Sequence, residues 1–342
     1  MVTPIFVLGL ERNGTTWLQN ILCNHPKIVG AQHQAHWGIK ESYICGNILY
    51  WGNFEDNDEF IEFLELYSSG DYFKLVEGNK EYFYQNRPED FADFFFELMD
   101  NYAEKKNATY WITKLDSLFY RHEELLDKFL TQLNERYEKI KFIGIRRRYE
   151  DVLMSYLNWQ GKENRRRRKP GFREIFSLYN TVEYAHGYNS IKHLISKYGG
   201  LMIRFELIKE DRGEMLNQVM RYLNIERTSE MFEDRYPPNS SYLGREERIT
   251  LPDWEKKLIY ESLLPIFQNK NFLNGIFRKI KDSFLNSILP VQCPLYWRLV
   301  KLERLKESFM IELDEKEKIG LKKFLFEEEY EQENRNETES HE

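Results

Sequence analysis

The sequence predicts an α/β fold, in which a central parallel sheet is covered by helices on both faces as a three-layer sandwich. Short apolar runs typical of buried strands alternate with longer segments whose apolar residues recur at helical spacing, and this alternation indicates parallel strands joined by helices. The chain also opens on an apolar run that passes through a glycine-containing loop into a helical pattern. One α/β domain is therefore expected over residues 1–275.

The individual elements follow from these patterns in chain order. Strands are expected at 5–9, 110–113, 140–145 and 201–205, with a short extra strand at 27–31. Helices are expected at 90–105, 121–137, 149–159, 172–198 and 214–223. After the domain, helical patterns without strands predict a helical C-terminal extension over 276–326, and a segment rich in Glu, Asn and Gln predicts an acidic disordered tail over 327–342.

The composition is that of a globular protein. Of the 342 residues 42% are hydrophobic and 15% aromatic, and the net charge of −7 argues against general binding of nucleic acid. No apolar run reaches the roughly 18 residues of a membrane span, and the run at 4–9 is too short for the core of a signal peptide. Cys23, Cys45 and Cys293 are far apart and are expected to be reduced thiols. These features predict a cytoplasmic protein.

Basic residues follow three of the predicted strands. Ligands of open α/β sheets bind at the carboxyl ends of the strands, so the residues directly after each strand are the first candidates for chemistry. Arg12 follows the first strand, Lys114 the strand at 110–113, and Arg147 the strand at 140–145. These cations indicate an anionic ligand at that edge of the sheet.

The loop after the first strand has the outline of a phosphate-binding loop, which makes the predicted sandwich P-loop-like. Gly9 and Gly14 have the spacing of G-x-x-x-x-G-K-[ST], and Thr16 takes the place of the magnesium-binding hydroxyl, but Thr15 stands where the lysine would be. Backbone N–H groups at the helix start still favour an anion. Without the lysine, a smaller diester-like group is expected rather than a nucleoside triphosphate. The alternative is a plain turn with Thr15 as a helix cap.

The segment Arg12-Asn13-Gly14-Thr15-Thr16-Trp17-Leu18 resembles the 5′-phosphosulfate loop, [KR]-S-G-T-T-W-L, of sulfotransferases that use 3′-phosphoadenosine 5′-phosphosulfate (PAPS). Asn13 departs from the common Ser but keeps a short polar side chain. The resemblance implies that PAPS is the sulfonyl donor, that 3′,5′-adenosine bisphosphate (PAP) is the product, and that no metal is needed. The residues that would bind the donor are then Arg12, Asn13, Gly14, Thr15, Thr16 and Trp17.

A second segment, Arg147-Arg148-Tyr149-Glu150-Asp151-Val152-Leu153-Met154-Ser155-Tyr156, resembles the family's R-[ND]-P-x-D-V-x-x-S-Y. In the family the first Arg and the Ser hold the 3′-phosphate, which implies this role for Arg147 and Ser155. A residue at the end of a strand and a second residue, two turns into the next helix, can both approach the same phosphate with charge-assisted hydrogen bonds.

Two further resemblances are weaker. Residues 202–209 resemble the family's [LV]-x-x-[RK]-Y-E-D-L with Phe205 in place of Tyr, so this ring can contact the nucleotide only by packing. Residues 244–254 resemble an R-K-G segment followed by G-D-W, from which Arg245 or Arg248 is expected to close over the 3′-phosphate. The sequence does not distinguish between these two arginines.

Sulfonyl transfer to a hydroxyl needs a base, and His33 is the first candidate. The protein-tyrosine branch of the family has a Glu base 21 residues after the loop Arg, and His33 has this spacing from Arg12. His36 is the rival candidate for the base, and it is also a candidate for substrate binding. His33 and His36 could instead bind a metal as a pair, but no third ligand is evident in the sequence. Glu41 is the third candidate for the base.

Lys114 resembles the Lys of the family's K-[TD]-[PH] motif, which supports the leaving or bridging oxygen. Another family branch has its catalytic His two positions later, where this chain has Asp116, and this departure favours His33 as the base. Asp116 is expected to assist or orient the acceptor, so Asp116 and His36 are the predicted substrate-binding residues.

The acceptor stays open between a small molecule, a lipid, a carbohydrate and a carrier-bound hydroxyl. The run Arg165-Arg166-Arg167-Arg168-Lys169 is either a solvated loop or a contact for an anionic acceptor or an acyl carrier partner. The predicted function is PAPS-dependent sulfation of a hydroxyl by in-line transfer. The alternatives are a P-loop-type nucleotide kinase and a nucleotide-binding protein without catalytic activity.

Overall fold

The computed structural model describes residues 2–33, 38–54, 56–117, 119–159, 184 and 187–236. The chain forms two compact units, Met1–Arg147 with Gly187–Ser240 and Arg148–His186 with Ser241–Glu342, called the first and the second unit below. The predicted helical extension at 276–326 and the predicted tail at 327–342 lie outside the described residues.

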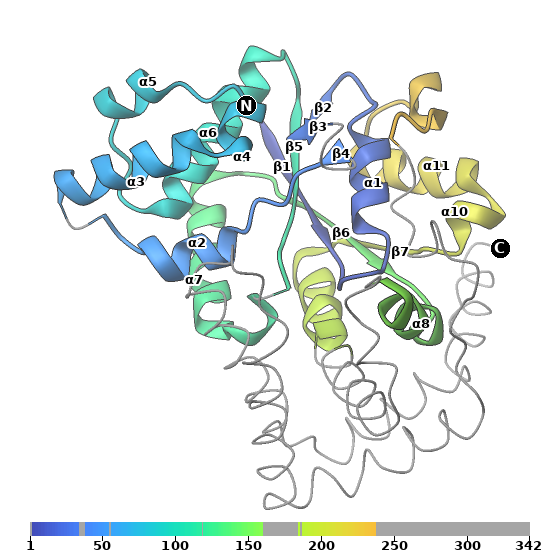
Figure 1. Cartoon of the computed structure of the whole chain (residues 1–342). Helices are drawn as coiled ribbons and strands as arrows, with labels where there is room; N and C mark the ends of the chain where they lie inside the picture. Colours follow the sequence, from blue (N-terminus) through green and yellow to red (C-terminus); the bar gives the residue numbers. More distant parts are fainter. Residues whose placement is uncertain are drawn as a thin grey trace, which may run out of the picture. The chain divides into compact units, whose positions relative to one another are not determined.

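Five parallel strands form the main sheet of the first unit (Figure 1). Their spatial order is β2 (Ile28–Val29), β5 (Tyr110–Lys114), β1 (Thr3–Leu8), β6 (Lys141–Arg146) and β7 (Leu201–Arg204). All five predicted strands are confirmed, with small shifts at their ends. The strand order reverses at β1, because β2 and β5 lie on one side of it and β6 and β7 on the other. The loop after β1 therefore lies at the switch point where open α/β sheets bind ligands.

The described helices alternate with the strands largely as expected. In chain order they are α1 (Thr15–Leu22), α2 (Ile44–Trp51), α3 (Asn57–Ser69), α4 (Asp71–Leu75), α5 (Lys80–Gln85), α6 (Phe91–Lys105), α7 (Glu123–Arg136), α8 (Tyr149–Trp159), α10 (Leu207–Glu210) and α11 (Arg212–Leu223), with short 3-10 helices at Phe119–Arg121 and Ser229–Phe232. The helices predicted at 90–105, 121–137, 149–159 and 214–223 are confirmed. Of the helix predicted at 172–198, residue 184 and residues 187–198 are described, and all of these are helical. None of the described helices is long and apolar enough to cross a membrane.

The two faces of the sheet are covered by different cores, since alternate residues of a strand point to opposite sides. Ile5 and Val7 of β1 belong to an aliphatic cluster with residues of α1 and α11. The ring of Phe6 lies 5.4 Å from that of Trp111 and 5.8 Å from that of Phe129 on α7. Each such buried side chain contributes roughly 1.5–3 kcal/mol relative to its exposure. Helices on both faces confirm the three-layer sandwich (Figure 1).

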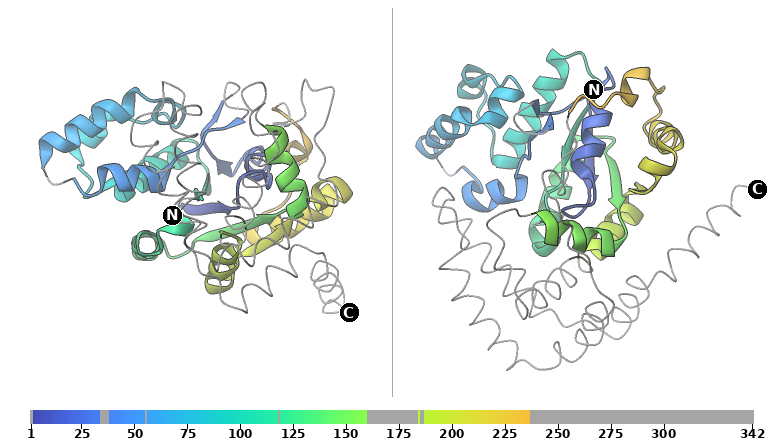
Figure 2. Two further views of the ribbon diagram at one scale, coloured as in Figure 1. Left: turned by 60° about the horizontal axis from the view of Figure 1, so that its bottom comes forward. Right: turned by 45° about the vertical axis from the view of Figure 1, so that its right-hand side comes forward.

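Helices α2 to α5 occupy a stretch for which the sequence patterns predict no element. Their packing is aromatic, as in the edge-to-face contact of Phe63 with Phe94 of α6, whose ring centroids are 4.8 Å apart. Asp56 caps α3, because its side chain accepts a hydrogen bond from the backbone N–H of Glu59 at 2.8 Å. Figure 2 shows these helices gathered beside the sheet. Short helices with aromatic residues spread around them give no clear helical period, which is why the patterns miss them.

A two-stranded hairpin of β3 (Gln32–His33) and β4 (Gly38–Ile39) lies outside the main sheet. Asn20 of α1 anchors it, because its Oδ1 accepts a hydrogen bond from the backbone N–H of Ile39 at 2.8 Å. Gly38 has a φ of +104°, and a Cβ there would lie 2.1 Å from Asn20 Oδ1. The hairpin is therefore docked against α1.

Candidate active site

Asn13 is buried inside the loop between β1 and α1 and holds the loop together with its side chain. This side chain is only 1% exposed, and its Nδ2 donates to the carbonyl oxygens of Leu10 at 3.2 Å and Glu11 at 3.4 Å. Two loop residues adopt the left-handed conformation, Arg12 with a φ of 69° and Gly14 with a φ of 96°. The replacement of Ser by Asn thus has a structural use: the longer amide reaches two loop carbonyls.

Gly14 is covered by the ring of Phe205, which directly follows β7. A Cβ added to Gly14 would lie 2.3 Å from Phe205 Cδ2, so only glycine allows this approach. Phe205 is fixed in turn by its backbone N–H, which donates to the carbonyl of Arg146 at 2.7 Å. The loop and the end of β7 are therefore packed as one piece.

Arg147, directly after β6, joins the same group. Its guanidinium carbon lies 4.6 Å from the centroid of the Phe205 ring, a cation–π arrangement. Its Nη1 donates to the carbonyl oxygen of Arg12 at 3.3 Å. The structure therefore brings together Arg12, Gly14, Arg147 and Phe205, which three separate motifs predict as donor-binding residues.

The start of α1 carries the other predicted residues of the loop motif. Thr15 is buried and Thr16 half-buried in its first turn, where the helix dipole and the free backbone N–H groups favour an anion. The Trp17 ring lies 5.2 Å from the guanidinium carbon of Arg212 on α11. Arg212 was not among the predicted residues, since nothing in its local sequence indicates a contact with the loop helix.

Five other sequence predictions stay predictions. Ser155 is buried in α8, a helix of the second unit. His36, Arg245 and Arg248 lie outside the described residues, as does the basic run at 165–169.

Lys114, the last residue of β5, is a buried cation surrounded by carboxylates. It is only 8% exposed, and its Nζ lies 3.2 Å from Glu41 Oε1. Burial lowers the Lys114 pKa, but the negative charges of Glu41, Glu11 and Asp116 outweigh burial and raise the pKa above its ordinary value. Lys114 is therefore charged at neutral pH and can stabilise negative charge on a reacting group.

Asp116 holds the start of α2. Its Oδ2 accepts a hydrogen bond from the backbone N–H of Cys45 at 2.9 Å, one of the N–H groups that a helix start leaves without a helical partner. The hydroxyls of Ser42 and Thr113 lie 2.9 Å apart in a second link. Together these contacts tie the segment that contains Glu41 to the carboxyl end of β5.

His33 lies on β3 and is exposed, opposite Gly38 in the hairpin. The base candidate with a described contact to Lys114 is instead Glu41, the third choice from sequence. Glu41 follows β4, a strand of the hairpin and not of the main sheet, so the rule that ligands bind at the carboxyl ends of parallel strands does not point to it. No motif or pattern in the sequence indicates a role for Tyr43, two residues further on.

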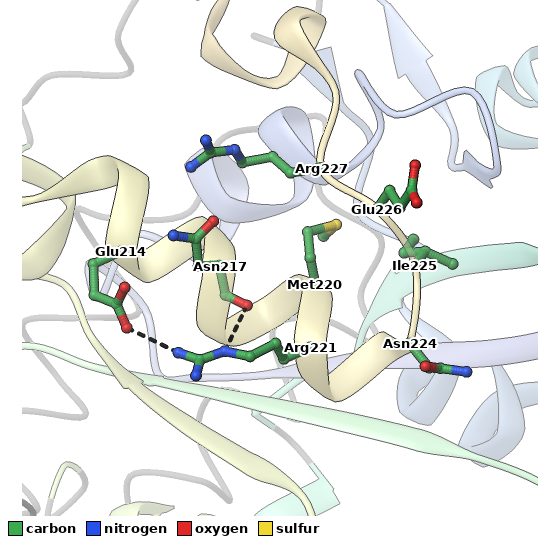
Figure 3. A pocket seen from close by; sticks show the side chains of 8 residues that line it. All are labelled: Glu214, Asn217, Met220, Arg221, Asn224, Ile225, Glu226 and Arg227. Atoms are coloured by element: carbon green, nitrogen blue, oxygen red, sulfur yellow. Dashed lines mark hydrogen bonds and ion pairs between the residues drawn. The ribbon is translucent and has the colours of Figure 1, made fainter. Parts of the chain in front are cut away.

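A separate open cavity of about 730 Å³ lies along α11 and the segment that follows it (Figure 3). It is lined by residues 214, 217, 220, 221 and 224–227, among which Glu214 pairs with Arg221 at 3.0 Å. None of its lining residues comes from the loop or from the end of β5, so the cavity is distinct from the group around Gly14. The described residues include no cluster of three or more His, Cys, Asp or Glu side chains that could hold a metal ion.

Comparison with solved structures finds sulfotransferases among the similar proteins. The sulfotransferase domain of the Synechococcus olefin synthase is 15% identical, with a TM-score of 0.43, over 92% of this chain and 96% of that one. The sulfotransferase domain of the curacin biosynthetic pathway is 15% identical, with a TM-score of 0.42, over 92% and 99%. A sulfotransferase from Alicyclobacillus acidocaldarius is 16% identical, with a TM-score of 0.41, over 78% and 92%.

A search of curated protein sequences gave no significant match. A family model described as "Sulfotransferase family" matches residues 4–230, which is well over half of the 342 residues. This stretch contains the loop, Lys114, Arg147 and Phe205. The chain therefore belongs to the sulfotransferase family.

Proposed function

We propose that this sulfotransferase moves a sulfonyl group from PAPS to a hydroxyl acceptor and releases PAP. The observation that carries the proposal is the meeting of Arg12, Gly14, Arg147 and Phe205 at the carboxyl ends of β1, β6 and β7. Gly14 lets the Phe205 ring pack on the loop, the backbone N–H groups at the start of α1 favour a phosphosulfate, and two guanidinium groups supply positive charge. The residues fit a donor with anionic groups on the 3′ and 5′ positions of its ribose.

Each residue then has one role. The N–H groups at the start of α1, with Arg12, Thr15 and Thr16, bind the 5′-phosphosulfate, and Asn13 keeps the loop closed. Arg147 binds the 3′-phosphate together with Ser155, as the motif resemblance implies, and Arg245 or Arg248 closes over it. Phe205 and Trp17 offer apolar surface to the nucleoside.

The transfer itself needs positioning and charge stabilisation more than covalent help. A base accepts the proton of the acceptor hydroxyl, the hydroxyl oxygen bonds to sulfur, and the bond between sulfur and the phosphate oxygen breaks. Lys114 and Arg12 stabilise the negative charge that develops on the transferring group and on the departing phosphate. This mechanism requires no metal.

For the base, the contacts favour Glu41 over His33. Glu41 lies 3.2 Å from Lys114, the cation proposed to face the reacting group, whereas His33 is an exposed residue of the hairpin. A carboxylate beside that cation can accept the acceptor proton and is held in place by the ion pair. His33, and His36 beside it, remain the second choice.

Cytoplasmic location stays part of the proposal. Cys23, Cys45 and Cys293 are few and far apart in the sequence, which is usual for proteins of a reducing compartment. The acceptor is proposed only as a hydroxyl of a small or carrier-bound molecule.

The test has a binding arm and a transfer arm. By calorimetry, we expect PAP to bind without magnesium and ATP with magnesium to bind weakly or not at all. Magnesium-dependent ATP turnover would instead support a nucleotide kinase. With radiolabelled PAPS and a panel of alcohols and phenols, we expect labelled products. PAP binding without transfer to any acceptor would support the non-catalytic alternative.

The base is tested by a matched pair of substitutions. Glu41→Gln should lower turnover by about 10²–10⁴-fold and leave PAP affinity within a few-fold. His33→Gln should keep most of the turnover. The reverse pattern would return the role to His33.

A further inference from the structure

Asn20 on α1 holds both strands of the β3–β4 hairpin. Its Oδ1 accepts hydrogen bonds from the backbone N–H of Ile39 at 2.8 Å and from Gln32 Nε2 at 3.3 Å. Gln32 Nε2 also donates to the backbone carbonyl oxygen of Asn20 at 3.4 Å. A single residue of α1 therefore contacts β3 and β4 together, and the hairpin is fastened to the second turn of this helix.

Gly38 makes room for this contact. A Cβ at Gly38 would lie 2.1 Å from Asn20 Oδ1 and 2.4 Å from Asn20 Cγ, and the φ of +104° at this position also favours glycine. At the open end of the hairpin, the backbone N–H of Lys40 donates to the carbonyl oxygen of Ala31 at 2.7 Å. The position of β4 relative to α1 is therefore defined by close packing as well as by hydrogen bonds.

Both candidates for the base belong to the segment that Asn20 holds, called the fastened segment below (residues 32–33 and 38–42). His33 is the last residue of β3, and Glu41 comes two residues after the end of β4. Beyond Glu41, the hydroxyl of Ser42 lies 2.9 Å from that of Thr113 on β5. Glu41 therefore lies between one anchor on α1 and another on β5.

The helix that carries Asn20 begins at the proposed donor site. Thr15 and Thr16 form the start of α1, where the backbone N–H groups favour an anion. Leu18 and Leu22 are fully buried and belong to the aliphatic core, so the helix is held firmly on the sheet. Because successive turns of a helix are hydrogen-bonded to one another, a displacement of its first turn also displaces Asn20. The donor loop, α1 and the fastened segment are thus mechanically connected.

We infer that Asn20 is a positioning residue, which fixes the base relative to the sulfonyl donor by tying the fastened segment to the helix that binds the donor. The inference rests on the proposed function. In-line transfer needs a defined geometry of base, acceptor oxygen and sulfur, and a displacement of about 1 Å can lower the rate roughly 100-fold. The role is the same for either base, because His33 and Glu41 both lie on the fastened segment.

The first experiment measures amide hydrogen exchange by mass spectrometry, with and without saturating PAP. In the unaltered protein, PAP should slow exchange in peptides that contain residues 38–42 by about fivefold or more, because binding at the first turn stabilises α1 and the segment tied to it. In Asn20→Ala this protection should be lost although PAP still binds. Asn20→Asp keeps the accepting oxygen and should keep the protection.

The second experiment separates positioning from stability by a matched control. Asn24, just after the end of α1, is also buried and donates through Nδ2 to the carbonyl oxygen of Glu233 at 2.8 Å, but it has no described contact with the hairpin. Asn20→Ala should lower kcat by about 10–100-fold and change PAP affinity by less than about threefold. Asn24→Ala should lose stability and keep kcat within about threefold, and Asn20→Asp should keep kcat within about fivefold.

Three results would overturn the inference. The first is an absence of PAP-dependent protection at residues 38–42 in the unaltered protein, or its persistence in Asn20→Ala. The second is a kcat of Asn20→Ala that is normal or no lower than that of Asn24→Ala. The third is a loss of PAP affinity in Asn20→Ala as large as the loss of kcat, which would assign Asn20 to the donor site.

Failure of the proposed function gives a different pattern. In that case the unaltered protein does not bind PAP, or it binds PAP and transfers the sulfonyl group to no acceptor of the panel. The exchange experiment needs no acceptor, so it decides separately whether Asn20 couples α1 to the hairpin.

Discussion

The carboxyl edge of the sheet has two halves that are stabilised in different ways. The loop half, consisting of residues 9–14 with Arg147 and Phe205, is fixed by close packing and by hydrogen bonds to backbone carbonyls. The lysine half, consisting of Lys114, Glu41, Asp116 and Tyr43, is held by an ion pair and by charge balance. One half therefore has the rigidity and cations of an anion site, whereas the other has the ionisable groups that the proposed proton transfer needs.

The largest expected effect is in the lysine half. Lys114→Met should lower turnover by about 10²–10³-fold, because it removes the cation from the transferring group and leaves the nearby carboxylates to repel it. PAP affinity should change by less than tenfold, measured by calorimetry. The control is Lys141→Met, since Lys141 lies 4.3 Å from the ring centroid of Tyr222 and not at the active edge. Normal turnover in Lys114→Met would contradict the assignment of the transfer step to the lysine half.

The next effect concerns the packing of the loop half. Gly14→Ala forces a Cβ to 2.3 Å from the Phe205 ring at a φ of +96°, whereas Gly199→Ala at a φ of +61° meets nothing within 4 Å. Both variants should lose about 1–2 kcal/mol for the left-handed residue. Gly14→Ala should lose about 1–3 kcal/mol more and bind PAP at least tenfold more weakly, as followed by denaturant unfolding and calorimetry.

Removal of the Phe205 ring makes the test of the Gly14 packing more specific. Adding Phe205→Ala to Gly14→Ala should cost less stability than the sum of the two single substitutions, because the clash disappears. Additive losses would mean that Phe205 does not limit the space above Gly14.

The sequence predicts the five strands and much of the loop half, because both depend on local patterns. Apolar runs identify β1, β5, β6 and β7, and motif spacing identifies Arg12, Gly14, Arg147 and Phe205. The lysine half is harder to predict from the sequence. Lys114 is visible as a strand end, but its partner Glu41 lies 73 positions away, in a segment that the links through Ser42 and Asp116 tie to the end of β5. Helices α2 to α5 were missed for a related reason, since aromatic packing between them replaces a regular period.

A smaller effect is expected at Asn13. Asn13→Ser should lose about 1 kcal/mol of stability, because a hydroxyl cannot reach both loop carbonyls. Asn13→Asp should lose at least about 2 kcal/mol, since it would place a buried negative charge against the carbonyl oxygens of Leu10 and Glu11. Thermal unfolding of the two variants measures the difference. If Asn13→Asp is as stable as Asn13→Ser, the amide of Asn13 does not hold the loop closed.

The smallest effect lies away from both halves, at His25. Burial lowers the pKa of His25 from 6.5, and its ring accepts from the backbone N–H of Lys27 at Nδ1, 3.1 Å away, while Nε2 donates to the carbonyl of Glu226 at 2.9 Å. Because the folded pKa is the lower one, the unfolded chain binds more protons between the two values. The free energy of unfolding should therefore fall as pH drops from about 6.5.

The variant His25→Gln isolates this contribution. Its free energy of unfolding should be lower at neutral pH but should depend less on pH between about 5 and 7 than that of the unaltered protein. Urea unfolding at several pH values measures both. An identical pH dependence in the two proteins would show that His25 does not titrate on unfolding.

The most direct test of the account is calorimetry with PAP on the unaltered chain, Arg147→Ala and Arg148→Ala. Arg147 stacks on Phe205 and reaches the loop, whereas its neighbour Arg148 is exposed, so the pair differs in position and not in charge. The account predicts that Arg147→Ala weakens PAP binding by about 10–100-fold, the worth of a charge-assisted contact, and that Arg148→Ala changes it by less than threefold. Equal affinity in all three proteins would contradict the claim that the loop half binds the nucleotide.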